Sequence, residues 1–139
     1  MQSTDQELAT RLRLALARSA RRLRQEAGTD LSPSLSAALA TVDRFGPLTP
    51  TELAARERVQ RPTITRVVCR LEEAGLVTRA ADPADGRSAL ITVSPAGREV
   101  LAEIRTRKDA FLSERLEALG PEDRATLERA AALLEGMLE

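Results

Sequence analysis

Apolar residues recur at steps of three and four along most of the 139-residue chain, which is the spacing of amphipathic α-helices. Five prolines precede stretches with this spacing, and proline favours the first helical position because it needs no amide hydrogen there. Thr49 and Glu52 frame one helix start as a capping box, and Gly75 is placed to end a helix in a left-handed conformation. The pattern predicts helices over residues 5–27, 33–45, 50–57, 62–74, 95–119 and 121–137.

The period changes between Leu76 and Val93. Residues 76–79 and 89–93 are short and partly β-branched, and residues 80–88 between them contain Pro83 and the pair Asp85-Gly86. Such turn residues between two short strands predict a β-hairpin with a long tip. The expected fold is therefore mainly α with a small β-hairpin wing.

The order of these elements predicts a winged helix-turn-helix over residues 32–93. The connector 57–61 is short, so the two helices that it joins must cross steeply, which presents the second one outward. We expect a single domain over residues 1–139. The helices in 1–31 and 94–139 carry broad Leu and Ala stripes that one chain can hardly cover, so these segments are expected to dimerise.

Composition excludes several classes of function. The chain has no His, Trp or Tyr and a single cysteine, which removes the usual zinc ligands, the usual base for a nucleophile and any disulfide within one chain. We expect no catalytic residue, no metal site, no cofactor and no enzymatic activity. No apolar run approaches the roughly 18 residues of a membrane span, and the N-terminus lacks secretory features, so a cytoplasmic protein is expected.

The helix over residues 62–74 carries the candidate chemistry. Its predicted buried face holds Ile64, Val67 or Val68, Leu71 and Ala74, which leaves outward Arg61, Thr65, Cys69, Pro62, Arg66 and Arg70, with Thr63 beside them. Between residues 58 and 70 there are four arginines and no carboxylate. Arginine can bond the acceptor pair of guanine, and threonine can bond a base edge or pack on the thymine methyl group. A solvated charged face is the alternative, but the helix-turn-helix context and Arg87 at the hairpin tip favour DNA binding.

The chain resembles the MarR-type (multiple antibiotic resistance regulator) family of winged-helix transcriptional regulators. The resemblance rests on Asp85-Gly86-Arg87-Ser88 after Asp82-Pro83, on residues 71–77 (LEEAGLV), on Thr63-Ile64-Thr65-Arg66 and on residues 93–97 (VSPAG). It implies that Arg87 enters the minor groove of DNA and that Asp85 braces it through an ion pair. The candidate DNA-binding residues are Arg61, Thr63, Thr65, Arg66, Arg70, Arg87 and Ser88, with Asp85 and Gly86 supporting the wing.

The same resemblance implies a homodimeric repressor with the helix over 62–74 in the major groove and the wing over 80–88 in the minor groove. The partners are double-stranded DNA, a second copy of the chain and a small-molecule effector whose binding residues are unassigned; no membrane is involved. Two recognition helices related by a two-fold axis would meet a near-palindromic operator with half-sites roughly 34 Å apart. The rival hypothesis is a winged-helix protein-interaction module that does not bind DNA.

Several charged residues have two possible interpretations from the sequence alone. Arg79 fits a phosphate contact or a solvated charge, and the sequence favours neither interpretation for Arg56 and Arg58. The arginines of residues 11–24 are expected to pair with acids near the C-terminus (Glu122, Asp123 and Glu128) rather than to touch DNA. Cys69 is expected to be a small filler rather than a redox sensor. The net charge of zero is a cancellation between basic and acidic segments, so it allows a surface that is basic only where a DNA groove would lie.

Overall fold

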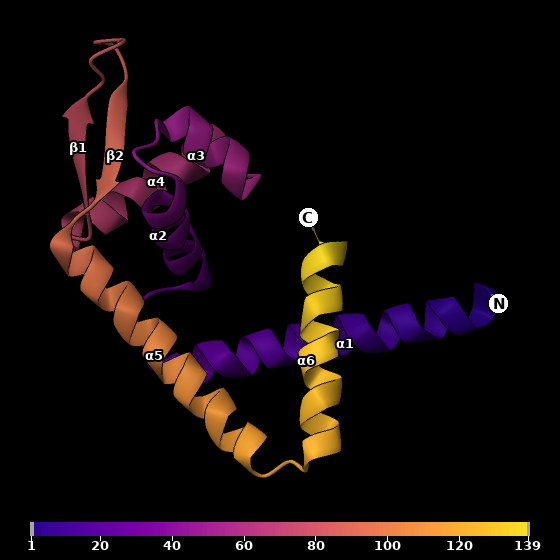
Figure 1. The fold of residues 1–139 in the computed structure, drawn as a ribbon. Helices are drawn as coiled ribbons and strands as arrows, with labels where there is room; N and C mark the ends of the chain where they lie inside the picture. The colour runs from indigo at the N-terminus through magenta and orange to yellow at the C-terminus, as the bar shows by residue number, and fades with distance from the viewer. Residues whose placement is uncertain (1, 139) are drawn as a thin grey trace.

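The computed structural model describes residues 2–138, which form six helices and one antiparallel hairpin (Figure 1). The predicted mainly α fold with a β-hairpin wing is confirmed. The helices are α1 (Gln2–Ala27), α2 (Pro33–Phe45), α3 (Pro50–Glu57), α4 (Arg61–Glu73), α5 (Pro95–Glu117) and α6 (Pro121–Met137), and the strands are β1 (Val77–Ala81) and β2 (Ala89–Val93). None of these helices combines the length and the apolar character that crossing a membrane requires.

Local signals located most element boundaries. Ser32, Thr49 and Ser94 each cap the helix that follows, with the side-chain oxygen accepting a hydrogen bond from a first-turn amide, and proline follows each cap. Gly75 takes the predicted left-handed conformation with φ of 74°. Some bounds differ by one to three residues from the prediction: α1 begins three residues earlier, α4 begins and ends one residue earlier, and α5 ends at Glu117 rather than at residue 119.

The hairpin is longer on its first strand than predicted. Pairing runs from Val77↔Val93 to Ala81↔Ala89, so β1 includes Ala80 and Ala81, which were expected in the loop. Alanine has little β preference, and these two residues are strand only because β2 supplies hydrogen-bonding partners. Leu48, just before α3, adds a further bridge: its amide donates to the Ile91 carbonyl at 3.1 Å, and the Ile91 amide donates back at 2.7 Å. The turn between α2 and α3 is thereby fixed to the wing.

The hydrophobic core lies inside the winged helix-turn-helix. Its largest fully buried side chains come from α2, α3, α4 and both strands, and they are Leu39, Leu53, Ile64, Val68, Leu71, Val77 and Ile91. The predicted inward face of α4 is confirmed for Ile64 and Leu71, and Val68 rather than Val67 is the buried valine. Ala74 was wrongly placed in the core. It is exposed because the chain turns at Gly75, and Leu76 takes the inward position instead.

One serine joins the wing, the recognition helix and the scaffold. The Ser94 hydroxyl donates to the Gly75 carbonyl at 2.6 Å and accepts from the Gly97 amide at 3.0 Å, while the Ser94 amide donates to the Leu76 carbonyl at 3.0 Å. Gly97 is required here, since an added Cβ would lie 2.2 Å from the Leu76 carbonyl oxygen. The start of α5 is therefore held against the turn that ends α4.

The flanking helices are poorly covered within one chain. α1 has one buried residue, Ala27, and no described residue of α6 is buried. Figure 1 shows α5 descending from the base of the wing past α1, and α6 turning back from the far end of α5. Large apolar side chains stay exposed on these helices, among them Leu8, Leu16, Leu112, Leu127, Leu133 and Met137.

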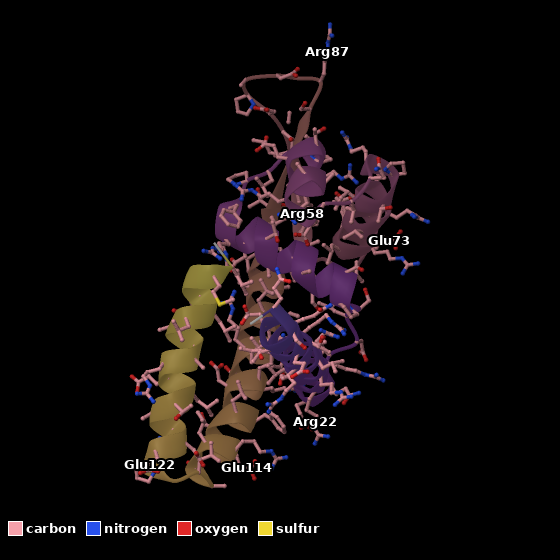
Figure 2. All side chains as sticks on the ribbon, turned by 90° about the vertical axis from the view of Figure 1, so that its right-hand side faces the viewer. Arg22, Arg58, Glu73, Arg87, Glu114 and Glu122 are labelled. Carbon is pink, nitrogen blue, oxygen red and sulfur yellow. The ribbon has the colours of Figure 1, made fainter. Side chains whose placement is uncertain are left out.

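The expected ion pairs between the arginines of α1 and the acids of α6 are not formed within residues 2–138. In that part of the chain the arginines of α1 make one ion pair, Arg22 to Glu26, one turn further along the same helix. Arg22 and Glu122 lie well apart in Figure 2. Within one chain the expected pairing is absent among the described residues, because α6 leaves the end of α5 without packing its length on α1.

Replacing Ser94 by alanine is expected to lower the free energy of unfolding by about 2–4 kcal/mol. A lost N-cap costs about 1 kcal/mol, and a buried group left without its partner costs about 1–3 kcal/mol more. Ser32→Ala is the matched control, because Ser32 caps α2 at an exposed position and its hydroxyl donates to no distant carbonyl among residues 2–138. We expect this variant to lose about 1 kcal/mol. Urea unfolding at one fixed protein concentration measures both. Equal losses would contradict the role given to Ser94.

Candidate nucleic-acid interface

The outward face of α4 is cationic, as predicted. Arg61, Thr65 and Cys69 lie on one exposed ridge, and Pro62, Arg66 and Arg70 lie on the next. The acids Glu72 and Glu73 come only at the end of the helix. Within residues 2–138, Arg61, Arg66 and Arg70 take part in no ion pair, so their charges are not cancelled by neighbouring carboxylates. The surface is suited to a polyanion.

The first turn of α4 is tied to the first turn of α3. Arg61 Nη1 donates to Thr51 Oγ1 at 2.6 Å, and Thr65 Oγ1 donates to the Arg61 carbonyl at 3.0 Å. Thr51 was not singled out from the sequence, because only the packing of α3 against α4 brings a residue ten positions earlier within reach. Thr63 is half-buried and lines a small groove with Pro33 and Val59, so it is less accessible than predicted.

The wing tip is built by hydrogen bonds to its own backbone. Asp82 Oδ1 accepts from the Ala84 amide at 2.9 Å, and Asp85 Oδ1 accepts from the Arg87 amide at 3.0 Å. The Ser88 amide donates to the Asp85 carbonyl at 3.0 Å, and the Asp82 amide donates to the Ser88 carbonyl at 3.0 Å. These bonds close a compact turn of the kind that Asp favours.

Arg87 stands at the far end of this turn and points away from the body of the molecule (Figure 2). The expected ion pair between Asp85 and Arg87 is not formed; among residues 2–138 the ion pairs lie elsewhere. Asp85 holds the backbone of Arg87 instead of its guanidinium. Gly86 does not use positive φ, and an added Cβ would meet nothing within 4 Å, so no steric need for glycine exists at this point.

Three further arginines have defined surroundings. Arg79 of β1 pairs with Glu72 of α4 (Nε to Oε2, 3.1 Å) and its Nη2 lies 3.6 Å from Cys69 Sγ, so it is neither free nor simply solvated. Arg56 stacks on the Phe45 ring at 3.8 Å from the centroid. Arg58 caps α3 in the left-handed region with φ of 55°.

Cys69 is exposed on the cationic face. No group of three His, Cys, Asp or Glu side chains among the described residues is arranged to hold a metal ion.

Comparison with known proteins identifies the architecture. The sequence model of the MarR family matches residues 31–89. An HTH-type transcriptional regulator of Mycobacterium bovis is 39% identical over 140 residues, which covers 100% of this chain and 98% of that protein. The chain belongs to the MarR family. The resemblance drawn from the wing and recognition-helix motifs is thereby confirmed.

Solved structures agree along the whole length. A MarR family protein from Bacillus stearothermophilus superposes with a TM-score of 0.85 at 26% identity, covering 99% of this chain and 97% of that one. A mutant of MepR from Staphylococcus aureus, solved bound to an oligodeoxyribonucleotide, shares the fold with a TM-score of 0.72 at 16% identity, covering 95% and 98%. The family match and the Mycobacterium relative show that this MarR protein is a transcriptional regulator with a DNA-binding helix-turn-helix.

Two substitutions at Asp85 separate a backbone role from an ion-pair role. Asp85→Asn keeps an oxygen that can accept from the Arg87 amide, whereas Asp85→Ala removes it. We expect Asp85→Ala to weaken binding to duplex DNA by roughly fivefold, the equivalent of about 1 kcal/mol for one hydrogen bond, and Asp85→Asn to lose much less. Fluorescence anisotropy with a labelled duplex at low salt measures both. An Asn variant as weak as the Ala variant would restore the ion-pair interpretation.

Proposed function

We propose that this MarR protein is a homodimeric repressor that binds a near-palindromic operator and is released by a small anionic ligand. In the proposed complex, α4 enters the major groove and the wing tip, Asp82–Ser88, lies over the minor groove. The observation that carries the proposal is the run of uncompensated arginines on α4, continued by Arg87 at the tip of the wing. Such an arrangement places charge along the path of a duplex backbone.

The roles of the site residues follow from their positions. Arg66 and Arg70 lie on the exposed ridge beyond the first turn, where bidentate bonds to guanine can be made, and Thr65 is placed to contact a base edge or a methyl group. Arg87 and Ser88 lie at the wing, where a narrow minor groove attracts guanidinium. Thr63 is half-buried, so we assign it a supporting contact rather than a base contact. The rival protein-interaction module requires acids or large apolar residues on this face, and α4 presents neither before Glu72.

The dimer is inferred from the uncovered flanking helices. Apolar side chains on α1, α5 and α6 remain exposed in one chain; Leu133 and Met137 are 67% and 66% exposed. A second copy related by a two-fold axis would cover such surfaces, since closed two-fold interfaces use the same patch on both chains. The axis would then set two α4 helices roughly 34 Å apart, one turn of DNA.

Selection of bound duplexes from a random pool at moderate salt tests DNA recognition and dimer geometry together. We expect a near-palindrome whose half-sites are separated by about one helical turn. Arg66→Ala should cost roughly 1–3 kcal/mol per half-site and relax one base position in each half-site, and Arg87→Ala should weaken binding at the wing. Arg124→Ala, an exposed arginine on α6, is the control. If no palindrome emerges and both variants bind like the unaltered protein, the proposal is wrong.

We propose that the effector binds in the cleft between α1, α2 and α5. The cavity has a volume of about 790 Å³, within the range of small-molecule sites. Its cations are Arg21, Arg24, Arg105 and Lys108, and no carboxylate of the described residues lines it. Arg105 is already paired with Asp43 (Nη2 to Oδ2, 2.9 Å), which leaves Arg21, Arg24 and Lys108 as the cations available to an anion. Its apolar walls include Leu23, Leu101 and Ile104, and the lining within residues 2–138 contains no aromatic ring. A small carboxylate with an aliphatic body fits this lining better than a stacked phenol does.

Hexanoate and its neutral counterpart 1-hexanol test the chemistry of the cleft. We expect hexanoate to stabilise the protein by about 1.4 kcal/mol at ten times its Kd. It should also weaken operator binding, because the proposed effector binds more tightly to the arrangement of the two α4 helices that does not fit the operator, and so shifts the population toward that arrangement. Hexanol lacks the charge and should do neither. Lys108→Gln should weaken the response to hexanoate. Thermal unfolding and anisotropy provide the readouts, and equal effects of hexanoate and hexanol would refute an anion site.

A further inference from the structure

We propose that Thr51 is a positioning residue for DNA binding: its hydroxyl holds the Arg61 guanidinium at the surface so that the guanidinium meets a DNA phosphate without first being ordered. The inference rests on the proposed DNA-binding role of Arg61. It concerns a residue on α3, the first helix of the helix-turn-helix, that no base-reading argument includes. The observation that carries it is the bond from Arg61 Nη1 to Thr51 Oγ1 at 2.6 Å.

The choice of acceptor is what matters physically. A carboxylate would also hold a guanidinium, but it would cancel the positive charge that attracts phosphate. The Arg79 guanidinium is held in that way by Glu72. Arg61 is held by a neutral hydroxyl, and within residues 2–138 it makes no ion pair, so its orientation is fixed while its charge stays available.

The acid in the first turn of α3, Glu52, already has a hydrogen-bonding partner. Glu52 accepts from the Thr49 hydroxyl at 3.0 Å, and its amide donates to Thr49 Oγ1 at 3.2 Å. The capping box therefore keeps Glu52 with Thr49. Thr51, one position earlier on α3, is exposed and is the residue that Arg61 contacts.

The bond leaves donors for a phosphate. A guanidinium has five N–H groups, of which Thr51 takes one, and the Thr51 hydroxyl accepts that bond while keeping its own hydrogen to donate. The remaining guanidinium donors thus stay available for a phosphate while Thr51 holds the side chain. Phosphate contacts of this kind fix the register of a protein on the duplex and carry no sequence information.

The benefit is a lower entropic cost of binding. An exposed arginine loses rotamer freedom when it is immobilised in a complex, and an arginine already held loses less. Removal of the hydroxyl should weaken DNA binding roughly threefold to tenfold for each protomer, the freedom of one long side chain, and so roughly tenfold to a hundredfold for the dimer. The number of phosphates neutralised should not change, because Arg61 still reaches its phosphate in the complex.

A double-mutant cycle on the full-length chain tests this, with Kd for the selected operator measured over a salt series. Thr51→Val removes the hydroxyl at nearly constant shape, Thr51→Ser restores it, and Arg61→Ala removes the charge. We expect Thr51→Val to raise Kd with an unchanged salt slope and Thr51→Ser to recover the affinity. Arg61→Ala should reduce the slope by about 1.8, because the proposed dimer loses one phosphate contact from each of its two copies of Arg61. In the Arg61→Ala background, Thr51→Val should have no further effect. Thr126→Val, which removes a hydroxyl from α6, controls for threonine loss.

The outcomes separate the inference from the proposed function. If Arg61→Ala leaves both Kd and slope unchanged, Arg61 does not contact DNA and the proposed role fails, and the inference fails with it. If Arg61→Ala acts as expected but Thr51→Val binds like the unaltered protein, the inference alone is overturned. Equal losses from Thr51→Val in both backgrounds would show that the hydroxyl acts independently of Arg61, which also overturns it.

Discussion

The attachment of α5 to the turn after α4 is the constraint on which the remaining arrangement depends. Ser94 satisfies the Gly75 carbonyl, caps α5 through the Gly97 amide and bonds the Leu76 carbonyl through its own amide. The end of the recognition helix, the end of the wing and the start of the long scaffold helix therefore share one buried hydrogen-bonded point. Leu48 adds a second attachment by pairing with Ile91, so the start of α3 is also fixed to the wing. Together these bonds make the DNA-binding module one unit with respect to the scaffold.

Much of the fold was accessible from the sequence because its signals are local. Serine or threonine followed by proline located the starts of α2, α3 and α5, and Gly75 located the end of the recognition helix. The errors arose where a partner distant in sequence decides the outcome. Ala80 and Ala81 are strand because β2 pairs with them, and Ala74 is exposed because Leu76 replaces it in the core.

The same distinction between local signals and distant contacts applies to the candidate DNA-binding residues. The outward position of the arginines on α4 is a consequence of helical periodicity, so the sequence was sufficient to find them. Sequence proximity of Asp85 and Arg87 did not decide whether the carboxylate bonds the guanidinium or the backbone amide; the turn geometry did. The contact between Thr51 and Arg61 and the partial burial of Thr63 both depend on how α3 and α4 pack, which no local pattern encodes.

The length of α5 has a mechanical consequence. Its 23 residues span roughly 35 Å at 1.5 Å per residue, and one end is fixed to the DNA-binding module by Ser94. A tilt of about 5° at the far end would move the Ser94 end by roughly 3 Å, which is close to the rise of one base pair, about 3.4 Å. The tilt angle of α5 thus determines where α4 lies along the DNA. A change of a few degrees in the tilt of α5 is therefore sufficient to shift α4 by about one base step. The buried hydrogen bonds of Ser94 couple the two movements, because they hold the start of α5 to the end of α4.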